Sequence, residues 1–188
     1  MLGAADVGPL GARNLLILLL MYRAGLRVSE VVNLLPRDIE REGVIHVYEG
    51  KGGDGTSYFT PDAVVPTLNR YLQLRYEWLC RHEGCMDGAH AMPLILNPDG
   101  SPVTVRYIQR LVRRLKARVG IAGIVTPHVF RHTFATELIE DGFPLHEVQR
   151  LLRHANIATT EVYLHVRDEQ LRDKMARRGQ RFGEGGTA

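Results

Sequence analysis

Five side chains in this sequence could together cleave a phosphodiester bond without a metal ion. Four of them, His128, Arg131, His154 and Tyr163, lie in the segment PHVFRHTFATELIEDGFPLHEVQRLLRHANIATTEVYLHV, and the fifth, Arg27, lies in an upstream GLRVSE. Arginines stabilise the negative charge of a phosphate under attack, histidines transfer protons, and a tyrosine hydroxyl is a nucleophile. The set predicts a DNA strand-transfer enzyme.

Phosphodiester chemistry explains why these residue types are needed. A guanidinium group pairs two phosphate oxygens in a fixed fork that an ammonium group cannot reproduce, which suits Arg27 and Arg131. Tyr163 needs a group that accepts its proton or stabilises its oxyanion, because a tyrosine has an ordinary pKa of about 10. His128 or His154 could help in either way. Each motif alone is usually structural, so the interpretation rests on their combination.

A lysine is predicted at the tip of a β-hairpin. Residues Val44 to Glu49 alternate as a strand, GKGGDG turns the chain, and Thr56 to Thr60 returns it, which leaves Lys51 in the turn. It is one of only three lysines among the 24 basic residues. From such a position Lys51 could protonate the oxygen that leaves the phosphate.

The elements around Arg27 are predicted to be two helices. Helical character runs from Gly11 to Ala24 and stops at Gly25, and Ser29 is expected to cap a second short helix that ends at Leu35. Arg27 would then lie at the corner between the two helices.

The rest of the chain is predicted to be almost entirely helical. A long helix is expected from Asp62 to Arg81, and the segments further along have the apolar spacing of helices: Thr104 to Val119, Pro127 to Glu140, Pro144 to Arg153, Ala158 to Val166 and Arg167 to Arg178. The predicted fold class is therefore mainly α with a small antiparallel β-sheet, an α+β fold.

Charge is concentrated on one predicted helix. The net charge of the 188 residues is only +3, but Thr104 to Arg118 contains six basic residues and no acidic one. Such a face is either solvated or in contact with DNA phosphates, and the basic residues predicted to contact DNA are Arg106, Arg110, Arg113 and Arg114.

The longest apolar run, residues 15–21, is far shorter than the roughly 20 residues of a membrane span, so we expect a soluble intracellular protein.

Metal and nucleotide sites are not expected. Cys80, His82, Cys85 and His90 are close in sequence, but their spacing matches no common zinc pattern. The segment GKGGDG lacks the order of a phosphate-binding loop, and LHEVQ lacks the second histidine of a zinc-protease motif. No metal or cofactor is therefore predicted. The other three histidines in the last third of the chain are interpreted as structural or surface residues: His132, His146 and His165.

Five features follow one another along the chain: GLRVSE, the hairpin lysine, H-x-x-R-H-T, L-L-x-H and T-T-x-x-Y-L-H. In this order they resemble the tyrosine recombinase (phage integrase) family, in particular its Xer-type members. The resemblance extends from about Gly11 to Met175 and matches the catalytic domain. It implies that Arg27 and Arg131 clamp the phosphate, His128 and His154 are active-site histidines, Lys51 is the general acid, Tyr163 is the nucleophile and Glu30 braces the site. The implied product is a 3′-phosphotyrosyl bond, formed without metal or ATP.

The same resemblance implies how the domain is organised and what it binds. Residues 1–178 would form the catalytic domain without the N-terminal core-binding domain, and residues 179–188 would be a disordered tail. The expected partner is double-stranded DNA. The protein would be a monomer in free solution and a homo-tetramer on DNA. Its expected location is the cytoplasm, in association with the nucleoid. Leu171 and Met175 form a narrow apolar stripe on the last helix, which would pack either on a neighbouring protomer or on its own domain.

The sequence departs from the family pattern at two places. Arg153 stands where a glycine commonly precedes the second histidine, and it would either crowd the backbone or contact DNA. The return strand of the hairpin lacks the basic residues that usually follow Lys51. Two alternative functions stay open: a non-catalytic DNA-binding module of the same fold, and strand relaxation like that of a type IB topoisomerase.

Overall fold

The computed structural model describes residues 1–49, 53–82 and 91–153. Lys51, His154 and Tyr163 lie outside the described residues, as do the helices predicted from Ala158 onward and the predicted tail. The chain divides into two compact units, Met1–Phe134 and Ala135–Ala188, so the boundary falls within one helix.

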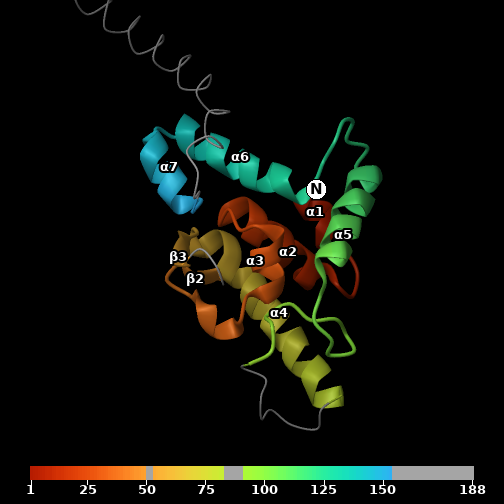
Figure 1. The fold of residues 1–188 in the computed structure, drawn as a ribbon. Helices are drawn as coiled ribbons and strands as arrows, with labels where there is room; N and C mark the ends of the chain where they lie inside the picture. The colour runs from red at the N-terminus through yellow and green to blue at the C-terminus, as the bar shows by residue number, and fades with distance from the viewer. Residues whose placement is uncertain (50–52, 83–90, 154–188) are drawn as a thin grey trace, which may run out of the picture. The chain divides into compact units, whose positions relative to one another are not determined.

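The core of the first unit is built around one buried helix. Helix α2 (Gly11–Arg23) has its apolar run Leu16–Met21 buried on all sides, and it packs against the long helix α4 (Pro61–His82) and the short α1 (Leu2–Ala5) (Figure 1). A helix that is apolar around its whole circumference is stable only when other elements cover it from several directions. Helices α2 and α4 confirm the two predicted ones to within a residue or two.

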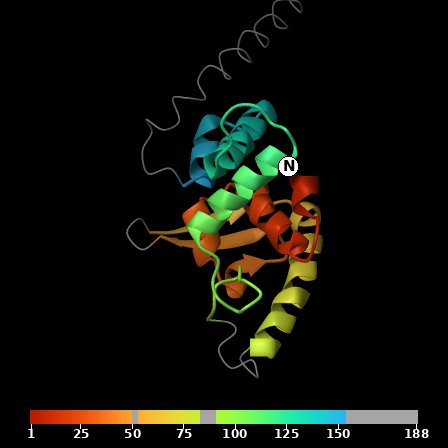
Figure 2. The ribbon, with the colours of Figure 1, turned by 90° about the vertical axis from the view of Figure 1, so that its right-hand side faces the viewer.

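A three-stranded antiparallel sheet borders this core. Its strands are β1 (Ile39–Glu40), β2 (Val44–Glu49) and β3 (Gly53–Tyr58), in the order β1-β2-β3. Figure 2 shows β2 and β3 side by side, and their register pairs Ile45 with Ser57. The expected return strand was wrong at both ends, because pairing begins at Gly53 and ends at Tyr58. Strand β1 was not predicted.

The corner after α2 differs from the expected one. Gly25 adopts φ +62 and the Leu26 amide donates to the Leu20 carbonyl, which ends α2 in a left-handed turn as predicted. Helix α3 (Val28–Asn33) then starts with Arg27 as its N-cap residue. The prediction that Ser29 caps this helix was wrong, because the helix begins before it and Glu30 accepts the hydrogen bond of the Arg27 amide. The helix ends at Asn33, before the 3-10 turn η1 (Pro36–Asp38).

A buried arginine joins the N-terminal half of the unit to the segment around the start of α5 (Val105–Arg118). The side chain of Arg13 is 0% exposed, donates to the Leu96 carbonyl at 3.0 Å and lies 4.6 Å from the ring centre of Tyr107. Burial lowers the pKa of Arg13, and the nearby tyrosine ring and carbonyl oxygen offset the loss of hydration. No pattern in the sequence singles out this residue, since an isolated arginine in an apolar helix usually lies at the surface.

The remaining described helices match their predicted positions. They are α5, which Thr104 caps through its hydroxyl, α6 (Pro127–Glu140) and α7 (Leu145–Leu151). Helix α6 contains the unit boundary, and the described part of the second unit consists of its last turns and α7. Among the described residues, no helix is long and apolar enough to span a membrane.

Candidate active site

Two of the predicted arginines meet at one carboxylate. Glu30 Oε1 accepts from Arg27 Nη1 at 2.8 Å, and Glu30 Oε2 accepts from the Arg27 amide at 2.6 Å. Arg131 Nη1 lies 3.8 Å from Glu30 Oε2 and donates to the Gly25 carbonyl at 2.5 Å. The structure therefore brings Arg27, Glu30 and Arg131 together from the α2–α3 corner and the first half of α6. We call these three residues the arginine cluster.

Burial differs among the members of the arginine cluster. The side chains of Glu30 and Arg131 are 6% and 7% exposed, whereas that of Arg27 is 30% exposed. A buried carboxylate and a buried guanidinium are tolerated only when they are paired and hydrogen-bonded. Two cations share one anion here, so the cluster keeps an excess of positive charge. That excess suits a phosphate that gains negative charge in the course of attack.

His128 lies one turn before Arg131, at the start of α6, and its side chain is exposed. It lines a cavity of about 450 Å³ together with two basic residues of α5, Arg113 and Lys116. Ile124, which also lines this cavity, is 86% exposed. The cavity is therefore both cationic and apolar, which suits the phosphate and the sugar of a nucleotide. Lys116 belongs to the basic run between Thr104 and Arg118, whereas no charge or spacing pattern in the sequence singles out Ile124.

The basic residues of α5 do not all face the same way. Arg106, Arg110 and Arg113 are exposed. Arg114 is exposed as well, but it lies 5.8 Å from the ring centre of Tyr107 and lines a second cavity, between α1 and α5. Of the four α5 residues predicted to contact DNA, Arg114 is therefore the one that the structure turns toward the protein's own N-terminal segment.

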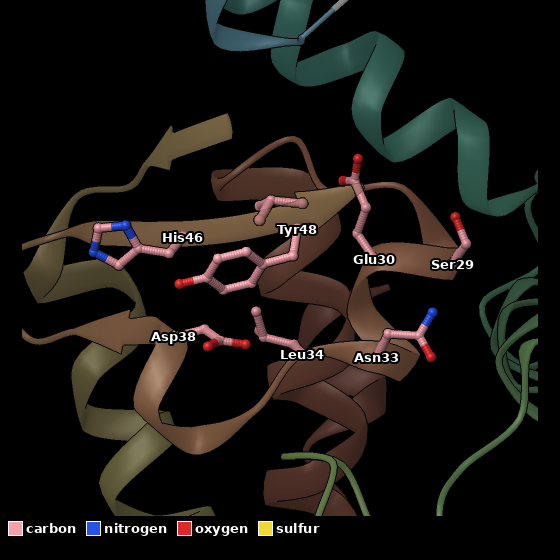
Figure 3. Close-up of a pocket in the computed structure, with 8 residues that line it drawn as sticks. Ser29, Glu30, Asn33, Leu34, Asp38, His46 and Tyr48 are labelled. Atoms are coloured by element: carbon pink, nitrogen blue, oxygen red, sulfur yellow. The ribbon is translucent and has the colours of Figure 1, made fainter. Parts of the chain in front are cut away.

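A third cavity, of about 280 Å³, lies between α3, η1 and β2. Figure 3 shows His46 and Tyr48 on one side of it, while the Glu30 carboxylate is directed away from them, toward the helix that carries Arg131. The Asp38 carboxylate accepts from the Leu35 amide at 2.8 Å, and His46 Nε2 lies 2.5 Å from Glu40 Oε1. The residues that line this cavity include the acidic Glu30 and Asp38 but neither a lysine nor an arginine, so the cavity does not suit a phosphate.

Arg153, the residue that replaces the family's glycine, has a left-handed backbone with φ +52. It follows the C-cap residue of α7, and its amide donates to the Arg150 carbonyl at 3.1 Å. This is the position at which helices favour glycine, because a Cβ atom is strained there. Its Nε and Nη1 atoms are buried, which limits what DNA could reach. The geometry shows an effect of Arg153 on the backbone, and its contact with DNA stays a prediction.

The Cys/His group considered for a metal is only partly described. Cys80 is a free, exposed thiol near the end of α4, and Cys85 and His90 lie outside the described residues. Within the described ranges, no three His, Cys, Asp or Glu side chains are grouped as metal ligands would be.

Comparisons with known proteins agree with the resemblance. Residues 1–170 match the Phage integrase family. The tyrosine recombinase XerC of Nitrobacter winogradskyi is 34% identical over 86% of this chain and 48% of its own, and XerD of Ralstonia nicotianae is 37% identical over 92% of this chain and 54% of its own. The chain thus spans about half the length of the curated relatives it matches.

Solved structures give the same result for the fold. The crystal structure of XerA recombinase is 31% identical, with a TM-score of 0.76 over 94% of this chain and 61% of that one. XerH recombinase bound to its difH substrate has a TM-score of 0.73 at 24% identity, over 90% of this chain and 49% of that one. The chain therefore belongs to the phage integrase family, is similar to the Xer-type tyrosine recombinases, and has the fold of a tyrosine recombinase catalytic domain.

Proposed function

We propose that this chain is the catalytic part of a site-specific recombinase that cuts and rejoins DNA through a covalent 3′-phosphotyrosyl intermediate. The observation that carries the proposal is the arginine cluster, in which Arg27 and Arg131 share Glu30. The Xer recombinases that the chain resembles, one of them solved on a difH substrate, support DNA as the substrate.

In the proposed reaction, the Tyr163 hydroxyl oxygen attacks the scissile phosphorus and the bond from phosphorus to the 5′ oxygen breaks. His128 or His154 accepts the tyrosine proton, and Lys51 donates a proton to the departing 5′ oxygen. Arg27 and Arg131 stabilise the charge on the non-bridging oxygens throughout. A 5′-hydroxyl from another strand then attacks the phosphotyrosyl bond and releases Tyr163, so the energy of the original linkage is conserved.

The proposed DNA interface continues from the cluster along α5. Arg106, Arg110 and Arg113 are exposed on that helix, and Arg113 and Lys116 lead into the cavity beside His128. Each phosphate contact that is lost should reduce the slope of log affinity against log salt by about 0.9. Alanine at Arg113 or Lys116 should therefore flatten the salt dependence, whereas alanine at Arg118, which donates to the Ala4 carbonyl, should change it little.

Assembly is proposed to depend on the C-terminal segment. In this proposal the protein is a monomer in free solution and a tetramer on two DNA sites in the nucleoid, and the stripe of Leu171 and Met175 packs on a neighbouring protomer. Deleting the residues after Arg167 should then weaken recombination between two sites more than cleavage of one site. Unfolding of the truncated chain would mean that the stripe packs within its own domain.

A nicked suicide substrate tests the proposed function directly. Cleavage next to the nick releases a short fragment that diffuses away, so the protein stays covalently bound to DNA and survives denaturing electrophoresis. A non-catalytic binding module would shift DNA only under native conditions. Joining of strands from two duplexes would identify a recombinase, while relaxation of supercoiled plasmid without joining would identify activity of the topoisomerase kind.

A further inference from the structure

A buried serine of β3 holds the corner that carries Arg27. The Ser57 side chain is on the inner face of the sheet and is 1% exposed, and its hydroxyl donates to the Ala24 carbonyl at 2.5 Å. Its partner across the sheet is Ile45, which is also fully buried. A buried hydroxyl at this position gives up apolar packing, and its hydrogen bond to the Ala24 carbonyl compensates for that loss.

Ala24 follows the last residue of α2, where a carbonyl has no donor from its own helix. The next carbonyl, that of Gly25, accepts from Arg131. Two consecutive carbonyls of the corner are therefore held from outside, one by the sheet and one by the cluster itself. Arg27 follows two residues later and bonds Glu30, so the position of this corner determines where both guanidinium groups lie.

We propose that Ser57 is a positioning residue for the arginine cluster: its hydrogen bond to Ala24 fixes the corner so that Arg27 and Arg131 address the same phosphate. The inference rests on the proposed function, because it assigns the cluster to a phosphate. Ser57 itself contacts neither DNA nor the reacting atoms, and it acts only through the Ala24–Gly25 backbone.

Positioning and plain stability predict different results. A positioning role makes Ser57→Ala slow cleavage at saturating DNA, because a misplacement of about 1 Å in a reacting geometry can cost about 100-fold in rate. We expect a loss of about 10- to 100-fold in the single-turnover rate, with DNA affinity changed by less than about twofold. A merely structural role would lower the melting temperature and leave the rate of the folded protein unchanged.

The experiment compares the full chain with Ser57→Ala, Ser57→Thr and Ile45→Val at a temperature where all are folded. The Ser57→Thr variant keeps a hydroxyl at this position, so it should recover most of the rate. Ile45→Val is the matched control, since it removes one buried methyl-sized group opposite Ser57 and leaves the Ala24 carbonyl bonded. It should cleave at the wild-type rate.

Two modified nicked substrates identify the groups through which Ser57 acts. A methylphosphonate at the scissile position lacks one charged oxygen and therefore depends less on two aligned arginines. A 5′-bridging phosphorothiolate has a leaving sulfur that needs little protonation, so it reports on the general acid instead. The deficit of Ser57→Ala, measured against wild type on the same substrate, should shrink on the methylphosphonate and persist on the phosphorothiolate.

The inference is overturned by a full cleavage rate in Ser57→Ala, by an equal loss in Ile45→Val, or by the same deficit on all three substrates. If Ser57→Ala does not fold, Ser57→Cys, which keeps the size and a weak donor, takes its place and must show a partial loss. Absence of any adduct with the unmodified chain would instead contradict the proposed function, so the two failures are distinguishable.

Discussion

Glu30 and Arg131 lie 3.8 Å apart at their charged atoms, although they belong to helices α3 and α6, which are far apart in the sequence. The same carboxylate bonds the side chain and the amide of Arg27. Glu30 thus both starts helix α3 and orients the two guanidinium groups. Local helix capping and the alignment of the arginines are functions of one side chain.

Replacing Glu30 with glutamine tests this double role. The amide keeps an acceptor for the Arg27 backbone but leaves two cations without their shared anion. We expect a loss of about 3–5 kcal/mol in the free energy of unfolding, typical of breaking a buried ion pair, measured by urea denaturation. Glu40→Gln is the control, because its pair with His46 is nearly half exposed and should be worth about 0–1 kcal/mol. Equal effects in the two variants would refute the bracing role.

Lysine substitutions test the phosphate clamp. Arg131→Lys and Arg27→Lys keep the charge but lose the planar fork, so each should slow single-turnover cleavage by about 10²–10³-fold, the loss typical of one preorganised charge stabiliser. Arg114→Lys, on the side of α5 that faces Tyr107, should cleave normally. Full activity in either clamp variant would mean that the arginine assignment is wrong.

How much of this site can be predicted from the sequence depends on the range of the interactions. The helix α6 that carries His128 and Arg131 was predicted with the correct ends, because Pro127 at its first position and Gly142 just beyond its last are local signals. The cap of α3 was not, since the choice of Arg27 over Ser29 follows from the turn at Gly25 and the bond to Glu30. The roles of Ser57 and Arg13 could not be predicted, because their partners are carbonyl groups far away in the sequence.

The alkaline limit of stability should depend on Tyr71. Its hydroxyl accepts from the Leu96 amide and donates to the Leu94 carbonyl, and burial raises its pKa from 10.0 to about 12. Below pH 10 the neutral tyrosine contributes fully to stability. Between about pH 10 and 12 the unfolded chain ionises first, so the free energy of unfolding should fall by up to about 3 kcal/mol.

Denaturation curves across that pH range check the prediction. Tyr71→Phe should be about 1–3 kcal/mol less stable at pH 8, because the buried Leu96 amide loses its hydrogen-bond acceptor, while the Leu94 carbonyl keeps its bond from Arg75 Nε. The fall in its free energy of unfolding above pH 10 should be shallower than in the wild type. Tyr48→Phe, at an exposed tyrosine, should follow the wild-type curve. A Tyr71→Phe curve parallel to that of the wild type would exclude Tyr71 as the titrating group.

Arg153→Gly should stabilise the protein. A left-handed residue with a side chain is strained by roughly 1–2 kcal/mol, and glycine removes that strain while it adds some entropy to the unfolded chain. The expected net gain is about 0.5–1 kcal/mol in thermal or urea unfolding. Arg153→Ala keeps the strained backbone and should show no gain, so a similar gain in both variants would trace the effect to the lost charge.

The formation of a covalent adduct by Tyr163 is the most direct test of the proposed function. The wild-type chain and Tyr163→Phe are incubated with the same radiolabelled nicked duplex and separated on a denaturing gel, with native binding measured in parallel. We predict a labelled protein–DNA adduct for the wild type and none for Tyr163→Phe, while both bind DNA with similar affinity because only one hydroxyl is removed. An adduct that persists in Tyr163→Phe would contradict the nucleophile, and its absence from the wild type would contradict the catalytic mechanism.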